Sequence, residues 1–152
     1  MSKASGEGPP KPLSKAKKRR AVALRAGGYC EYCRLVEKGQ LGPFHLEHVV
    51  PSSQGGSDEL ENLAWACSAC NLMKSDRTGV SDPLTGEAVP IFSPRQMTWR
   101  DHFEWSGYRL VGRTPIGRAF IRFLDLNSAK RLAIREDEDF LGYFTGSENP
   151  PL

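Results

Sequence analysis

The sequence has no run of about 18 apolar residues, the length a helix needs to cross a membrane. Its N-terminus is polar and basic, without the short apolar stretch of a secretory signal. It also has no internal repeat and no coiled-coil heptad pattern. The missing apolar span and the missing signal favour an intracellular, cytoplasmic protein without a membrane partner. A chain of 152 residues is long enough for one domain with a modest core.

Acidic residues are almost missing from the first 28 positions. This stretch carries eight Lys and Arg residues against one acid, Glu7, and therefore a net charge of +7. Because the whole chain carries +3, the remaining residues together carry −4. A basic arm on a near-neutral body suits a polyanionic partner such as nucleic acid. A solubilising tail is the alternative.

Composition and turn residues divide the chain into three parts. Residues 1–12 are rich in Ser, Gly, Pro and Lys and predict a disordered basic tail. Residues 13–110 predict the main domain, which opens with a basic helix over 13–26 that two glycines end. Residues 111–145 predict a helical extension packed on the same domain.

Short elements are expected inside the main domain. Apolar residues predict strands at 44–50 and 63–66, and a helix opens near residue 68. A strong turn signal covers 82–87, and the aromatic segment 99–107 predicts a packed strand or turn.

Two helices are expected in the extension. Thr114 and Pro115 have the residue types of an N-cap and a first helical position. A second helix is predicted over 127–141, and its acidic run from Glu136 to Asp139 is interpreted as a solvated face.

All four cysteines occur as two pairs, Cys30-x2-Cys33 and Cys67-x2-Cys70, with 33 residues between the pairs. This spacing predicts a tetrahedral four-cysteine zinc site. Because protein sulfur fills all four positions, no position is open to substrate and the zinc is structural. An iron–sulfur cluster and disulfides are the alternatives.

A second set of residues lies between and after the cysteine pairs in a fixed order. Glu47-His48 is followed by two apolar residues and a proline, then by Gly-Gly-Ser, by Asn62-Leu63, and by Asn71 directly after the last cysteine. Together with the cysteines, this order resembles the HNH endonuclease family over about residues 30–74. The segment 77–118 also resembles the downstream part of small bacterial HNH proteins.

The resemblance implies an α+β fold with a ββα-metal, treble-clef-like core, pinned by the four-cysteine zinc site. It also implies metal-dependent hydrolysis of phosphodiester bonds in DNA. His48 is the expected general base, since a neutral imidazole can accept a proton near pH 7. Glu47 and Asn71 are the expected ligands of a catalytic Mg²⁺, Mn²⁺ or other divalent cation. Asn62 is expected to brace the loop between the strands and so to position the site.

Two positions depart from the usual pattern of the family. Asn71 replaces the final His of the family name, and Glu47 replaces the more usual Asp. Glu47 and His48 are also neighbours in a predicted strand, so their side chains should point to opposite faces. Both serve one site only if the strand ends or bulges there. His45 shares the face of Glu47, as a third ligand or as a structural histidine.

The expected partner is nucleic acid, in particular double-stranded DNA. The phosphate contacts are assigned to basic residues of the N-terminal helix and of the segment after the last cysteine: Lys15, Lys17, Lys18, Arg19, Arg20, Lys74 and Arg77. The rival interpretations are a non-catalytic zinc-stabilised module that binds nucleic acid, and a metal-sensing or protein-binding zinc domain.

Overall fold

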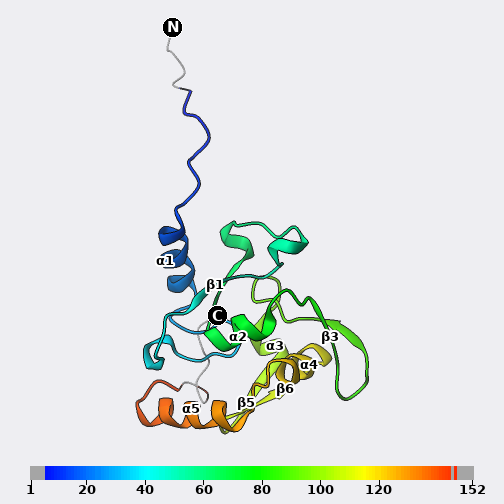
Figure 1. Cartoon of the computed structure of the whole chain (residues 1–152). Coiled ribbons are helices and arrows are strands. Elements are labelled where there is room, and N and C mark those ends of the chain that lie inside the picture. Colours follow the sequence, from blue (N-terminus) through cyan, green and yellow to red (C-terminus); the bar gives the residue numbers. More distant parts are fainter. Residues whose placement is uncertain (1–5, 145, 147–152) are drawn as a thin grey trace.

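The computed structural model of the chain describes residues 6–144 and 146. Part of the predicted tail, residues 1–5, and the last residue of the predicted extension, 145, lie outside the described residues. The described chain is a mixed α+β fold of helices and two-stranded antiparallel sheets (Figure 1). Among its helices, none has both the length and the apolar character needed to span a membrane.

The elements follow one another in this order: α1 (Lys15–Arg25), η1 (Glu37–Gly39), β1 (His45–His48), η2 (Ser52–Gln54), η3 (Leu60–Asn62), β2 (Leu63–Ala66), α2 (Ser68–Lys74), β3 (Gly79–Ser81), β4 (Ala88–Pro90), α3 (Trp99–His102), β5 (Phe103–Ser106), β6 (Arg109–Gly112), α4 (Pro115–Phe123) and α5 (Ala129–Phe140).

Helix α1 forms where the basic helix was predicted. Ser14 is its N-cap and accepts a hydrogen bond from the backbone N–H of Lys17, which satisfies one free donor of the first turn. The helix packs on β1 and β2 through its buried Val22. Arg19 adds a contact of its guanidinium with the Trp65 ring at 4.9 Å. The basic helix is therefore held against the hairpin that carries the candidate site.

Strands β1 and β2 form a regular antiparallel hairpin, and α2 follows directly. His45 lies opposite Ala66 and His48 lies opposite Leu63. The predicted strands at 44–50 and 63–66 are thus confirmed, the first of them shortened to four residues. In α2 the sulfur of Cys67 acts as the N-cap and accepts from the backbone N–H of Cys70.

The predicted turn at 82–87 joins β3 to β4 and ties this hairpin to α4. The Asp82 carboxylate receives two hydrogen bonds from Arg118, at 3.0 and 2.8 Å. This guanidinium holds the pKa of Asp82 well below its usual range. Helix α4 begins as predicted, with Thr114 accepting from the backbone N–H of Gly117.

The segment predicted as a strand or turn at 99–107 is a short helix, α3, followed by β5. Its aromatic side chains turn inward. Trp99 and Phe103 lie 5.1 Å apart between ring centroids, and Phe103 also contacts Phe92 and Phe120. This aromatic cluster is the part of the core that joins the downstream segment to α4.

The acidic run of α5 is not a uniform solvated face. Glu136, Asp137 and Asp139 are exposed, but Glu138 is buried and accepts a hydrogen bond from the backbone N–H of Val36 at 3.0 Å. Burial raises the pKa of Glu138 to about 7. The prediction was wrong at this position because Glu138 lies on the face of α5 that packs against the loop after the first cysteine pair.

Candidate functional site

The four cysteines converge on one buried point. Their sulfur atoms all lie within 4.8 Å of one another, and the Sγ atoms of Cys33 and Cys67 are 3.7 Å apart. Four sulfurs at tetrahedral positions around an ion, with bonds of about 2.3 Å, lie about 3.8 Å apart. The cluster therefore has the donor set and spacing to hold one tetrahedral metal ion.

A buried cation from the C-terminal extension lies beside this cluster. Arg131 of α5 donates to Cys70 Sγ at 3.6 Å and to the carbonyl of Leu124. Burial lowers the pKa of Arg131, but the nearby sulfurs of Cys33, Cys70 and Cys67 more than offset this and leave it raised. Four thiolates around a divalent ion carry a net negative charge, which the Arg131 guanidinium can balance. No motif around Arg131 indicated this contact in the sequence.

His48, the predicted general base, ends strand β1 and is paired with a carboxylate. Its Nε2 lies 2.6 Å from Asp58 Oδ1, and this hydrogen bond lowers the pKa of Asp58. When Nε2–H donates to Asp58, the Nδ1 atom of the neutral ring carries the free lone pair. The pair thus orients an imidazole that can accept a proton at Nδ1. Sequence reasoning missed Asp58, whose only signal was a carboxylate just after the Gly-Gly-Ser loop.

Two surface cavities meet at His48. One, of about 330 Å³, is lined by Glu47, His48 and Asn71 together with residues of the 51–53 and 75–76 segments. The other, of about 370 Å³, is lined by His48 and Asp58 and by Lys15 and Lys18 of α1. The structure thus brings the three predicted catalytic side chains to one cavity, with two predicted phosphate contacts next to it.

Glu47 is buried and already paired with protein groups. Its Oε1 lies 2.6 Å from Lys74 Nζ, and its Oε2 accepts from the Tyr32 hydroxyl. Only 4% of Glu47 is exposed. Burial raises the pKa of Glu47, while Lys74 and the Tyr32 hydrogen bond act in the opposite direction. As arranged, this carboxylate does not fit a divalent cation, because the Lys74 ammonium lies where a cation would bind.

Lys74 is therefore positioned differently from the expectation that it contacts phosphate. It is 1% exposed, and its Nζ also donates to the backbone carbonyls of His48 and Val49 at 3.3 and 3.2 Å. In this position Lys74 fastens α2 to the end of β1 and cannot reach a phosphate at the surface.

Strand β1 has no bulge at Glu47 and His48, since its pairing with β2 stays in register. The two side chains thus lie on opposite faces, as expected for neighbours in a strand. Glu47 points into the core, and His48 lies at the half-exposed surface where the strand ends. Both border one cavity because the chain turns away directly after His48.

Asn62 joins the two ends of the loop between the strands. Its Oδ1 accepts from the backbone N–H of Val50, and its Nδ2 donates to the carbonyls of Val50 and Ser57. Gly56 lies against the same loop, where an added Cβ would be 1.7 Å from the Val50 carbonyl oxygen. Asn62 and Gly56 thus fix the path of the loop that carries Asp58.

The remaining predicted phosphate contacts are distributed over two surfaces. Lys15, Lys17 and Arg20 are exposed on α1, whereas Arg19 is engaged with the carbonyl of Phe44. Lys18 donates to the backbone carbonyl of Asp58 at 2.7 Å. Arg77 is exposed beyond α2, with its guanidinium 5.3 Å from the Phe123 ring.

The other two histidines of the chain, His45 and His102, do not line the cavities at His48. His45 lies 3.1 Å from the Ser68 hydroxyl, and His102 lies 2.6 Å from the Thr114 hydroxyl and against the Phe92 ring.

Comparison with known families identifies the domain that these elements form. Residues 30–77 match the model of the HNH family, described as HNH endonuclease. The chain therefore contains an HNH domain, which spans both cysteine pairs, the β1–β2 hairpin and α2, and nuclease-type function follows for this domain in general terms. Searches of curated proteins and of solved structures gave no match.

Proposed function

We propose that the protein is an HNH endonuclease that hydrolyses phosphodiester bonds in nucleic acid, with double-stranded DNA as the substrate and His48 as general base. The observation that carries the proposal is that His48, which is paired with Asp58, lines one cavity together with Glu47 and Asn71. A carboxylate on one ring nitrogen fixes the orientation of the imidazole and makes the other nitrogen the better base.

Substrate binding is assigned to α1. Lys15 and Lys18 line the cavity beside His48, and Lys17 and Arg20 add exposed charge to the same helix. Phosphates that follow this helix would bring one phosphodiester to the cavity beside His48. His48 then accepts the proton of the attacking water, and Asp58 stabilises the imidazolium that results.

Zinc is the metal that we assign to the four cysteines, because four thiolates at tetrahedral spacing suit this ion. It would hold the two cysteine pairs together and have no part in the reaction.

A divalent cation such as Mg²⁺ or Mn²⁺ would supply a Lewis acid for the leaving oxygen. The amide oxygen of Asn71, half-buried on α2 and lining the cavity, is a suitable hard donor. Glu47 would join it only after Lys74 had left the carboxylate. The same pairing of Glu47 with Lys74 supports the rival function, a non-catalytic module that binds nucleic acid.

Cleavage of supercoiled plasmid with Mg²⁺ or Mn²⁺ tests the proposal, with His48→Ala and His45→Ala as matched variants. His45 lies three residues away on the same strand and does not line the cavities at His48. His48→Ala should lower the cleavage rate by about 10²- to 10⁴-fold, whereas His45→Ala should stay within a few-fold of wild type. An inert wild-type protein that still retards DNA would establish the binding module instead.

A further inference from the structure

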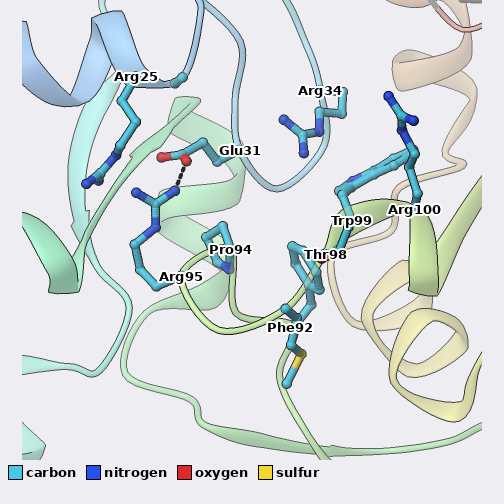
Figure 2. Close-up of a pocket in the computed structure, with 11 residues that line it drawn as sticks. Arg25, Glu31, Arg34, Phe92, Pro94, Arg95, Thr98, Trp99 and Arg100 are labelled. Carbon is cyan, nitrogen blue, oxygen red and sulfur yellow. Dashed lines mark hydrogen bonds and ion pairs between the residues drawn. The ribbon is translucent and has the colours of Figure 1, made fainter. Parts of the chain in front are cut away.

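A separate cavity of about 230 Å³ lies between three segments (Figure 2). They are the C-terminal end of α1, the segment of the first cysteine pair and residues 92–100. This cavity shares no lining residue with the two cavities at His48. Its charged lining consists of four arginines and one glutamate: Arg25, Arg34, Arg95, Arg100 and Glu31.

The one carboxylate of this arginine pocket is already in use. The Oε1 atom of Glu31 accepts a hydrogen bond from the Arg95 guanidinium. Its Oε2 atom accepts from the backbone N–H of Trp65 at 2.7 Å. With Arg100 left out of the count, the three guanidinium groups of Arg25, Arg34 and Arg95 against one carboxylate leave a formal charge of +2 at the pocket.

The hydrogen bonds of Arg25 bring no negative charge to the pocket. Arg25 donates to the neutral backbone carbonyls of Leu60 and Leu63, which carry no countercharge. Burial lowers the pKa of Arg25, and the positive charge of Arg95 lowers it further. The arginines are therefore held close together at an electrostatic cost that an anion in the pocket would remove.

Arg34 is the side chain with unused donors. Its Nε is buried and has no hydrogen-bond partner, and its guanidinium contacts the Trp99 ring at 5.3 Å. Within the described chain its side chain makes no hydrogen bond. In Figure 2 the guanidinium extends toward the side of the pocket where Glu31 lies. The Nε of Arg95 is likewise buried without a partner. Buried donors of this kind cost free energy until an acceptor reaches them.

The size of the pocket limits the ligand. Pockets for drug-sized molecules measure about 300–1,000 Å³, so this one suits a single small group rather than a whole nucleotide. Arginine forks match the oxygens of a phosphate, to which they donate paired hydrogen bonds. We propose that the arginine pocket binds one phosphate group, with Arg34 as its anchor. The phosphate belongs either to a free phosphate compound or to the end of a nucleic acid strand. The site is independent of catalysis at His48.

Titration calorimetry with inorganic phosphate tests the site, against chloride at equal ionic strength. Arg34→Gln removes the charge without breaking a hydrogen bond of the folded chain, and it should weaken phosphate binding about ten- to a hundredfold. Arg109→Gln, at an exposed position on β6, is the matched control and should bind phosphate like wild type.

A second variant tests the pocket independently of any folding defect in Arg34→Gln. Thr98 is exposed at the N-cap of α3, where Asp is a favoured residue, so Thr98→Asp should keep the fold while adding a negative charge to the pocket lining. It should also weaken phosphate binding at least tenfold.

Short oligonucleotides with a 5′-phosphate or a 5′-hydroxyl distinguish the two sources. Tighter binding of the phosphorylated strand, lost in Arg34→Gln, assigns the pocket to a strand end. Equal binding of both strands, with inorganic phosphate binding lost in Arg34→Gln, assigns it to a free phosphate compound. No phosphate binding by wild type, or equal phosphate binding by wild type, Arg34→Gln and Thr98→Asp, would overturn the proposal.

Discussion

The pair of Glu47 and Lys74 gives the sharpest test of how this core is held together. Lys74→Met keeps most of the side-chain volume but removes the ammonium and its three hydrogen bonds. Among the described residues, the buried Glu47 carboxylate then keeps the Tyr32 hydroxyl as its one hydrogen-bond partner. The side chains of Lys74 and Glu47 are 1% and 5% exposed, so water cannot replace the lost charge.

Removal of one partner from such a pair costs about 3–5 kcal/mol. For a chain of this length, that corresponds to a fall in Tm of roughly 6–20 °C. The double variant Glu47→Gln, Lys74→Met removes both charges and should lie within about 2 kcal/mol of wild type. Lys130→Met, at an exposed position on α5, is the control and should change stability by about 0.5 kcal/mol or less.

The defect of Lys74→Met should also depend on pH. Burial already raises the pKa of Glu47, and loss of the opposing effect of Lys74 must raise it further. A carboxyl whose pKa is higher in the folded than in the unfolded state loses stability as pH rises through the folded value. The difference from wild type should therefore grow as pH rises above the ordinary range of a carboxyl group.

Thermal unfolding followed by circular dichroism measures all four proteins. Melting of Lys74→Met within about 2 °C of wild type would refute the idea of a buried anchor, as would a double variant no more stable than the single one. Glu47→Ala tests the same pair from the side of the carboxylate. The buried pair now predicts that it destabilises the protein, because Lys74 would be left buried without its carboxylate.

Two further predictions concern the cysteine cluster and the loop. Cys67→Ser should abolish tight zinc binding and unfold the core, because a structural zinc site contributes on the order of 10 kcal/mol to folding. Metal content and circular dichroism measure both effects. A well-folded, zinc-free variant would contradict the prediction. Gly56→Ala should lower stability by about 3 kcal/mol or more, because its Cβ would overlap the Val50 carbonyl. Gly39→Ala meets no atom within 4 Å and should melt like wild type, so equal melting of both alanine variants would show that the loop is not tightly packed.

Much of the fold follows from local sequence patterns. Ser14 and Thr114 cap α1 and α4 as their residue types indicate, because a cap needs only the side chain and the next turn of the chain. The spacing of the cysteines indicated one metal cluster, and the order of motifs around Glu47 and His48 indicated an HNH domain. These features depend on short segments of the chain, or on a metal site whose ligand spacing can be read from the sequence.

Only the tertiary structure decided how the charged residues are used. The sequence determined that Glu47 and His48 are neighbours, but the packing of α2 against β1 decided that Glu47 pairs with Lys74. The path of the loop decided that Asp58 reaches His48. Burial of Glu138 and the gathering of Arg34 with distant arginines likewise depend on contacts between remote segments. The physical reason is that the role of a charged side chain depends on its burial and on its nearest partner. Both are fixed only when the chain has packed.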